Sequence, residues 1–413
     1  MKKKLLIIGF VWPEPQSSAA GSRMMQLIAC FSEEGYNITF ASACAKTENA
    51  SDLQFLGIDQ VTIALNDSSF DEFISELQPE IVVFDRFMTE EQYGWRVAEQ
   101  CPSALRILDT EDLHSLRKGR EQAFKDNKPF EYSYLLNDTS KREIASIFRC
   151  DLSLIISEAE MDILTQFFKV DDSLLYYLPF LLHPVSEEHC DNLPKFKKRE
   201  HFITIGNFLH PPNYQSVLYL KKHIWPLIRQ QLPTAELHIY GAYASQKVNQ
   251  SHSDTDGFLI KGYAEDVSEV MQQAKVCLAP LQFGAGLKGK LIDAMQNGTP
   301  CVMSSVGAEG MFGSLDANGF ISDDVDDFVN AAVALYTNKV IWKDAQNKGF
   351  QVIYARFQYS DFKSDFIQLV NDLKSILETH RQGNFTGQML QHHSLQSTKF
   401  MSKWIEEKQK SRK

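Results

Sequence analysis

The sequence predicts an α/β fold in which two doubly wound domains, each with a parallel sheet covered by helices, face each other across a cleft. Short apolar runs alternate with segments of 3.6-residue periodicity, and this alternation occurs twice, before and after a polar stretch at residues 184–200. The length of 413 residues suits two domains of roughly 150–200 residues better than one. With 44% hydrophobic and 23% charged residues, the composition indicates a folded chain rather than a disordered one.

In the first half, short apolar runs predict buried parallel strands, and the periodic segments between them predict helices. The first run follows Lys2-Lys3-Lys4, so a signal peptide is an alternative interpretation. We favour a strand, because Pro13-Glu14-Pro15 follows at once and a helical pattern comes next. No run approaches the roughly 18 apolar residues of a membrane span. The predicted strands are Leu5–Phe10, Ile38–Ser42, Ile81–Asp85, Leu105–Asp109 and Leu152–Ile156, and the helices include Ser22–Glu34 and Glu90–Gln100.

The second half repeats the pattern and ends in helices that we expect to cross back onto the first domain. The boundaries we predict are 1–183 for the first domain, 184–200 for a linker, 201–382 for the second domain and 383–413 for a C-terminal tail. The predicted strands are Phe202–Ile205, Glu236–Tyr240, Phe258–Lys261, Val276–Ala279 and Cys301–Ser304, and the helices are Tyr214–Gln231, Leu287–Asn297, Val325–Tyr336 and Ser360–Thr379.

The charge and cysteine content exclude some classes of function. A net charge of −11 argues against a general nucleic-acid-binding protein. The tail differs, because residues 399–413 contain six basic and two acidic residues. A surface helix with a basic face is one interpretation, and a docking element for an anionic acceptor or partner is the other. The seven scattered cysteines form no CxxC pair, which predicts reduced thiols in a cytosolic protein without a zinc site or disulfide framework.

The clearest chemical signal is the glycine-rich turn from Gly284 to Lys290, which follows a predicted strand and opens a helix. Glycines let the backbone approach a phosphate, and a helix N-terminus offers free N–H groups with a favourable dipole. Lys288 and Lys290 add two cations that can neutralise a diphosphate without a metal. Asp293, one helical turn later, is a candidate to accept hydrogen bonds from ribose hydroxyls. The alternative is a glycine turn with solvated lysines.

A second strand–loop–helix follows directly, with the loop sequence Val306-Gly307-Ala308-Glu309-Gly310. Its small residues, Gly307 and Gly310, suit a second close backbone approach to the same ligand. An ordinary βα connection is the alternative, and it remains open for Glu309.

The segment from Gly284 to Gly310 resembles the nucleotide-sugar-binding segment of GT-B-fold glycosyltransferases of the family-4 type, in the branch with a GAG-x-K-x-K turn and a VGAEG loop. The resemblance covers about 202–320 well and the N-terminal half more loosely. It implies two Rossmann-like domains, with a UDP- or GDP-sugar donor on the second and an acceptor hydroxyl on the first. It also implies retention of anomeric configuration, no metal and no other cofactor. The implied setting is bacterial surface-glycan synthesis on a glycan or lipid-linked acceptor, in the cytoplasm, with weak association with the inner membrane face.

Two departures from the family pattern concern the donor. Members of this family often carry two glutamates eight positions apart; here the first position is Ala285 and the second is Asp293. Many also have Arg and Lys in the loop after the second domain's first strand, whereas Asn207–Asn213 has neither. Lys288 and Lys290 would then supply all the charge for the diphosphate. Three alternatives therefore stay open: an inactive nucleotide-sugar-binding subunit, a GT-B-fold epimerase, and a transferase acting on a nucleic acid or protein.

Charged residues also follow the strand that ends at Asp109, where residues at the carboxyl end of a parallel strand are well placed for chemistry. The resemblance implies a histidine beside the donor sugar, so His114 is our catalytic candidate together with Asp112. A structural, hydrogen-bonded histidine is the alternative. Asp109 and Asp112 are candidates to position acceptor hydroxyls or to cap the next helix, and Arg117 to pair with them.

The loop after the first strand supplies further acceptor-side candidates. Gly21 and Arg23 lie at the start of the first predicted helix, where contact with an acceptor or phosphate is reasonable. The alternative is an ordinary helix N-terminus with an arginine on the surface.

Overall fold

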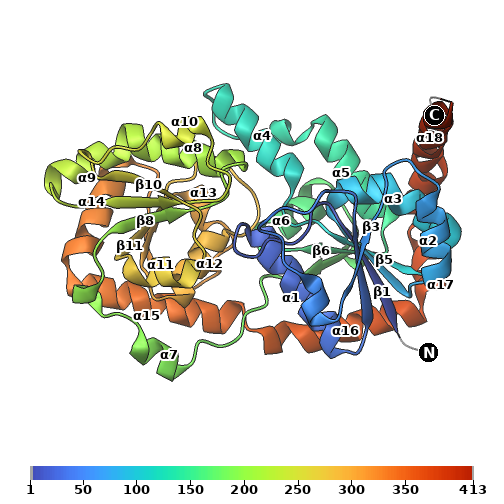
Figure 1. Cartoon of the computed structure of the whole chain (residues 1–413), viewed down its shortest axis with the longest axis horizontal. Helices are drawn as coiled ribbons and strands as arrows, with labels where there is room; N and C mark the ends of the chain where they lie inside the picture. Colours follow the sequence, from blue (N-terminus) through green and yellow to red (C-terminus); the bar gives the residue numbers. More distant parts are fainter. Residues whose placement is uncertain (1–2, 412–413) are drawn as a thin grey trace.

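The computed structural model describes residues 3–411, apart from the side chains of residues 394–396, and shows two α/β domains side by side (Figure 1). The first contains a seven-stranded sheet in the order β3-β2-β1-β4-β5-β6-β7, and the second a six-stranded sheet in the order β10-β9-β8-β11-β12-β13. Every strand pairing in both sheets is parallel. The predicted fold class, two doubly wound domains, is confirmed.

The first sheet is buried along its central strands, which is why these segments read as continuous apolar runs. The strand interpretation of the first apolar run is confirmed, since it forms β1. Two short strands were not predicted: β3 is half-exposed and β7 has only three residues. The strands are β1 Lys4–Gly9, β2 Asn37–Ser42, β3 Asp59–Thr62, β4 Ile81–Asp85, β5 Leu105–Asp109, β6 Leu152–Ile155 and β7 Leu175–Tyr177; the helices are α1 Ala19–Glu33, α2 Ser69–Leu77, α3 Arg86–Gln100, α4 His114–Lys125, α5 Asp138–Arg149 and α6 Glu158–Asp162.

In the second domain the five predicted strands are present, whereas the edge strand at Gly319–Ile321 was not predicted and one predicted helix is interrupted. The stretch predicted as a single helix over Tyr214–Gln231 is divided by a π-helical turn at Leu220–Ile224, just before Pro226, which lacks the N–H that would continue the α-helical bonding. The strands are β8 Phe202–Ile205, β9 Leu237–Tyr240, β10 Phe258–Gly262, β11 Val276–Ala279, β12 Cys301–Met303 and β13 Gly319–Ile321; the helices are α8 Pro211–Tyr219, α9 Trp225–Gln231, α10 Gln246–Asn249, α11 Val267–Gln273, α12 Gly289–Gln296, α13 Ser305–Ala308, α14 Val325–Thr337 and α15 Lys339–Arg356.

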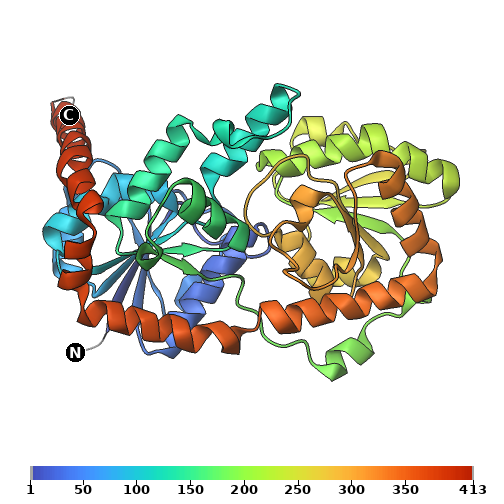
Figure 2. The ribbon, with the colours of Figure 1, turned by 180° about the vertical axis from the view of Figure 1, so that it is seen from behind.

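The chain crosses between the domains twice. The predicted linker contains a short helix, α7 Glu187–Asn192, and after α15 the chain returns to the first domain as α16 Tyr359–Ser375 and α17 Leu377–Gly383 (Figures 1 and 2). Phe366 and Val370 of α16 are buried in the same core as Phe31 of α1. The expected return of the last helices to the first domain is therefore confirmed, and residues 359–382 pack with the first domain rather than the second, to which the predicted boundary assigned them.

The C-terminal tail forms α18, Phe385–Lys410, which lies along the outer side of α3 and α5 (Figure 1). Arg96 of α3 is buried and pairs with Glu406 of α18 and with Asp71 of α2. Trp404 stays exposed with Lys408 over its ring, and residues 412–413 of the basic tail lie outside the described residues. No helix within residues 3–411 is long and apolar enough to cross a membrane.

Candidate functional site

The glycine-rich turn after β11 lies directly against the first domain. A Cβ added to Gly286 would lie 2.8 Å from the Cβ of Asp112, and one added to Gly310 would lie 2.6 Å from Oγ of Ser157. Both glycines have positive φ angles, of 64° and 74°. Only glycine fits this combination of conformation and spacing without strain. The glycines of the two predicted ligand loops therefore permit close approach of the two domains.

Two lysines stand at this turn, Lys288 buried and Lys290 partly exposed, and within the described residues their hydrogen bonds go to uncharged acceptors. Lys288 donates to the carbonyl oxygens of Ala285 and Gly286, and Lys290 donates to Oδ1 of Asn213 at 2.9 Å. Burial lowers the pKa of each lysine to about 8. Their charged forms are thus less favoured than those of exposed lysines, and the interpretation as a solvated lysine does not hold for Lys288, which is 8% exposed.

The lysines stand at the start of α12, and no side chain in the described part of the chain caps this helix. Its free N–H groups and its dipole favour negative charge at the same place as the ammonium groups. Asp293 lies three residues after Lys290, and burial raises its pKa to about 7 although Lys290 acts in the opposite direction. The arrangement can hold a polyanion beside a hydrogen-bond acceptor.

His210, in the loop between β8 and α8, is a residue that the sequence analysis missed. Burial lowers its pKa to about 4, and the charges of Arg117, Lys290 and Lys288 act in the same direction. The loop has no Lys or Arg, as noted from the sequence, but this histidine faces the same cationic cluster. The signal that could have found it is its position immediately before Pro211, the first residue of α8.

On the first-domain side, Asp112 holds both an arginine and a histidine. Its carboxylate accepts from Arg117 and lies 3.4 Å from Nε2 of His114. Burial raises the pKa of Asp112, but Arg117 and His114 together hold it below its usual value. Burial lowers the pKa of His114 to about 3, and its ring stands edge-on to Phe87. The site thus pairs a charged Asp112 with a neutral His114, and Asp112 does not cap α4.

The start of α4 is instead held by carboxylates from two other helices. Glu143 of α5 accepts the backbone N–H groups of His114 and Ser115 at 2.9 and 3.0 Å, and Glu160 of α6 accepts that of Leu113 at 3.0 Å. Burial raises the pKa of Glu143 to about 7. These contacts satisfy N–H groups that a helix start leaves free and fix the loop that carries the catalytic candidates.

The predicted acceptor-side residues form a packed unit. Nε of Arg23 lies 3.0 Å from Oδ1 of Asp109, and Arg23 also donates to the carbonyl oxygen of Leu178 at 2.6 Å. Arg23 is only 1% exposed, so the interpretation as a surface arginine is wrong, and Asp109 pairs with it rather than capping α4. A Cβ on Gly21 would lie 2.4 Å from the backbone of Glu14. These contacts pack all three residues, but within the described residues Nη2 of Arg23 and Oδ2 of Asp109 have no hydrogen-bond partner. Contact with an acceptor stays a prediction.

Glu309 of the second loop pairs with the first domain. Arg120 of α4 donates to both oxygens of Glu309, at 2.6 and 2.8 Å, and to the carbonyl oxygen of Gly284 at 2.9 Å. The N–H of Gly307 is engaged inside its own loop, where Oγ of Ser304 accepts it at 3.1 Å. Glu309 and Gly284 thus connect the two domains, and Gly307 stabilises the start of α13.

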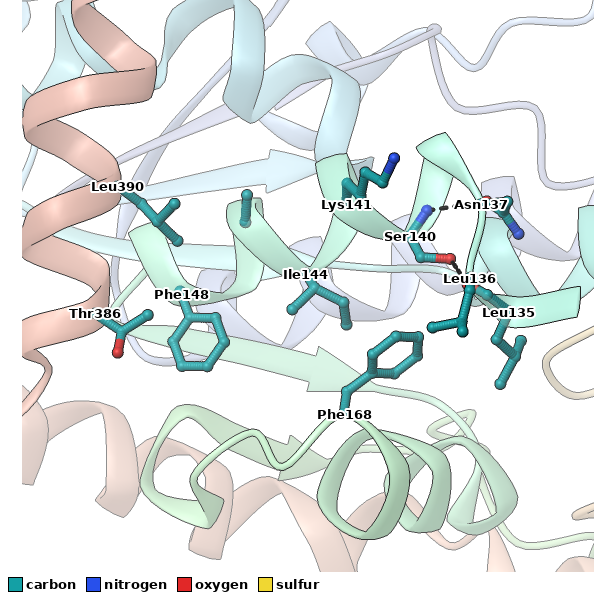
Figure 3. A pocket seen from close by; sticks show the side chains of 11 residues that line it. Leu135, Leu136, Asn137, Ser140, Lys141, Ile144, Phe148, Phe168, Thr386 and Leu390 are labelled. Atoms are coloured by element: carbon teal, nitrogen blue, oxygen red, sulfur yellow. Dashed lines mark hydrogen bonds between the residues drawn. The ribbon is translucent and has the colours of Figure 1, made fainter. Parts of the chain in front are cut away.

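A separate apolar groove lies on the outer side of the first domain (Figure 3). Its volume is about 340 Å³, near the lower limit for ligand pockets, and α5, α18 and the turn at residues 132–136 surround it. It contains none of the residues that the sequence analysis singled out. Its larger apolar side chains are those of Leu135, Leu136, Ile144, Phe148, Phe168 and Leu390.

Comparison with known proteins agrees with this geometry. Residues 199–338 match the family model described as "Glycosyl transferases group 1", and this segment contains the turn and both lysines. An uncharacterized 44.6 kDa protein in the cps region of Klebsiella pneumoniae is 26% identical over 186 residues, 43% of this chain and 45% of that protein. The aligned part thus spans less than half of the relative. These matches support a glycosyltransferase.

Solved structures show the same fold at low identity. A TarM mutant from S. aureus is 17% identical, with a TM-score of 0.57 over 73% of this chain and 58% of that one, less than two thirds of its length. Sucrose-phosphate synthase from Thermosynechococcus elongatus is 14% identical, with a TM-score of 0.65 over 91% of this chain and 100% of that one. HepE from Anabaena, in complex with UDP and glucose, is 11% identical, with a TM-score of 0.66 over 90% and 100%. The chain has the GT-B fold.

Proposed function

We propose that this protein is a glycosyltransferase, family-4-like, that moves a sugar from a nucleotide-diphosphate donor to an acceptor hydroxyl. The observation that carries the proposal is the pair of ammonium groups of the buried Lys288 and the partly exposed Lys290, at the start of α12, which no side chain among the described residues caps. A buried cation is costly without an anionic partner, and a diphosphate supplies one. The match of residues 199–338 to "Glycosyl transferases group 1" supports a sugar as the transferred group.

In this proposal the second domain holds the donor. Lys288 and Lys290 bind the diphosphate and stabilise its charge as it leaves, without a metal. Gly284 and Gly286 bring the turn close to the ligand, and Gly307 and Gly310 do so for the second loop. Asp293 accepts hydrogen bonds from the ribose. HepE has been solved with UDP-glucose and a TarM mutant with UDP, which supports UDP as the nucleotide.

The first domain presents the acceptor. The bond from the anomeric carbon to the diphosphate oxygen breaks, and the acceptor oxygen bonds to that carbon from the same face, so configuration is retained. The hydroxyl proton passes to the departing diphosphate. Asp112 and the neutral His114 lie beside the donor sugar, and Gly21, Arg23 and Asp109 form the acceptor side.

For the acceptor we propose a glycan or lipid-linked glycan of surface-glycan synthesis, reached from the cytoplasm with weak association at the membrane surface. Three matches support this class. The relative from Klebsiella pneumoniae lies in a cps region, TarM was solved with alpha-GlcNAc-glycerol, and WaaG is described as involved in lipopolysaccharide biosynthesis.

A ligand screen tests the donor assignment. Thermal unfolding is measured with UDP, GDP and their common sugar conjugates, since a ligand that binds only the folded state stabilises it by RT ln(1 + [L]/Kd). We expect one nucleotide diphosphate to raise the unfolding temperature and its sugar conjugate to yield a glycoside with a suitable acceptor. If no nucleotide diphosphate changes the unfolding temperature at millimolar concentration, the proposal is wrong.

Ala285 favours a second candidate, an inactive nucleotide-sugar-binding subunit. Its side chain is 6% exposed and packs into the first domain's core, so this position of the turn offers no carboxylate to a donor sugar. Slow hydrolysis of the bound donor without acceptor would exclude this candidate. Conversion of the donor into another nucleotide sugar would instead indicate an epimerase.

A further inference from the structure

One carboxyl oxygen connects the two domains where they meet. Glu160, on α6 of the first domain, is fully buried, with 0% of its surface exposed. Its Oε1 accepts the N–H of Gly286 from the second domain at 2.7 Å and the N–H of Leu113 from the first at 3.0 Å. Gly286 belongs to the turn before Lys288, and Leu113 immediately precedes α4. The same atom therefore holds the backbone of both loops.

Stability alone does not explain this side chain. Oε2 of Glu160 has no hydrogen-bond partner within residues 3–411, and leaving a buried polar atom unpaired costs about 1–3 kcal/mol. Burial raises the pKa of Glu160 to about 8, and Asp112 raises it further, while the two N–H donors and Lys288 act in the opposite direction. Glu160 is therefore a costly group at a position where both domains meet.

The other contacts between the domains work differently. Arg120 pairs with Glu309 and one carbonyl oxygen, and Arg356 of α15 pairs with Glu158, which is about half exposed. These are long side chains that can move while keeping a contact. Glu160 instead fixes two backbone N–H groups through a single atom, which leaves little freedom in the distance between the loops.

We propose that Glu160 is a positioning residue that sets the spacing between the donor-binding turn and the loop carrying Asp112 and His114 when the domains are closed. The inference rests on the proposed function, which assigns the donor to that turn and the reacting centre to that loop. Glu160 itself touches neither substrate. Because its partner Gly286 belongs to the other domain, opening of the cleft breaks one of its two hydrogen bonds and retains the other.

Amide hydrogen exchange tests the connection without any substrate. Glu160→Ala should raise exchange at Leu113 and at Gly286 together, by at least about tenfold, because both amides lose their acceptor. Glu160→Gln keeps a carbonyl oxygen in the same place and should retain most of the protection. Glu143→Ala is the matched control: it releases the amides of His114 and Ser115 inside one domain and should leave Gly286 protected. If Glu160→Ala leaves Gly286 protected, the inference is wrong.

Kinetics then tests the consequence. A displacement of about 1 Å can reduce a rate about 100-fold, so Glu160→Ala should lower kcat about 10- to 100-fold per folded molecule. The donor KM should change less than about threefold, because the lysines that hold the diphosphate remain. Glu160→Gln, which keeps the accepting oxygen, should have a kcat within about threefold of the wild-type value. Glu158→Ala, on the same helix, also removes a contact between the domains and should leave kcat unchanged.

The outcomes separate this inference from the proposed function. A wild-type enzyme that transfers sugar while Glu160→Ala keeps full kcat would overturn the positioning role and leave the function intact. A wild-type protein that transfers no sugar from any donor would overturn the function, and the exchange at Gly286 would then decide alone whether Glu160 sets the closed spacing. A loss of kcat that Glu160→Gln does not recover would also overturn the inference.

Discussion

Cationic side chains in the two domains have different partners. In the second domain, Lys288 and Lys290 donate to carbonyl and amide oxygens within the described part of the chain. In the first domain, Arg23 pairs with the Asp109 carboxylate at 3.0 Å. An ammonium group with neutral acceptors can exchange them for a phosphate, whereas Arg23 could do so only by leaving Asp109 buried and unpaired. Whether a buried charged group binds a ligand or serves packing is therefore indicated more by its hydrogen-bond partner than by its position at the end of a strand.

The largest effect that this comparison predicts is on donor use. Lys288→Ala combined with Lys290→Ala should lower kcat/KM for the donor at least about 1,000-fold, because both diphosphate cations are lost. Steady-state kinetics and calorimetric titration with the nucleotide diphosphate measure this. Lys348→Ala is the control, since Lys348 pairs with Asp316 and Asp344 on the surface of the same domain. A double variant with wild-type donor affinity would contradict the comparison.

Much of the fold was predictable from the sequence, because buried parallel strands are continuous apolar runs. The strands predicted at Ile81–Asp85 and Val276–Ala279 have the observed bounds. The edge strands β3 and β13 were missed. Both are partly exposed to solvent, so neither sequence contains the continuous apolar run that marks a central strand. The sequence did not show which of the last helices packs against the first domain. Periodicity indicates that a helix has an apolar face but does not identify the surface that this face covers.

The site was predictable only where local sequence carries the chemistry. The turn at Gly284–Lys290 combines glycines, lysines and a helix start within seven residues, so its lysines could be found. Glu160 and Arg120 could not, because their partners lie 126 and 189 residues away in the sequence. His210 has a local signal in its position before Pro211, but the cationic cluster that it faces is assembled from both domains. Sequence spacing also could not show that Arg23 and Asp109, 86 positions apart, are paired.

The second prediction concerns stability. Arg23→Ala should lower the free energy of unfolding by about 3–5 kcal/mol, because it leaves the buried Asp109 carboxylate without its partner. Urea unfolding measures this, and donor affinity per folded molecule should be unchanged. Arg142→Ala is the control: its pair with Glu91 is half exposed on the arginine side, so the loss should stay below about 1 kcal/mol. Normal stability with weakened acceptor binding would instead make Arg23 an acceptor-binding residue.

The smallest predicted effect is the pH dependence of donor binding. Burial lowers the pKa of Lys288 and Lys290 from 10.5 to about 8, so both are mostly charged below that pH and lose their charge above it. The dissociation constant for the donor should therefore rise about twofold between pH 7 and 8 and about fivefold from pH 8 to 9 for each lysine that contributes. Calorimetric titration from pH 7 to 9.5 measures this. The pKa of Glu160 is also raised to about 8, so above that pH its negative charge repels the diphosphate and weakens donor binding further. Glu160→Gln removes this contribution to the pH dependence.

The same two lysines should make folding stability depend on pH in the opposite direction to donor affinity. Their pKa is lower in the folded protein than in the unfolded chain, so the unfolded chain binds more protons between about pH 8 and 10.5. Their contribution to stability without donor should therefore rise across this window, while donor affinity falls. This contribution is measured as the difference in thermal unfolding between the wild type and the variant with both Lys288→Ala and Lys290→Ala, across the same pH range. A donor affinity that is flat from pH 7 to 9.5 would show that the lysines do not bind the diphosphate.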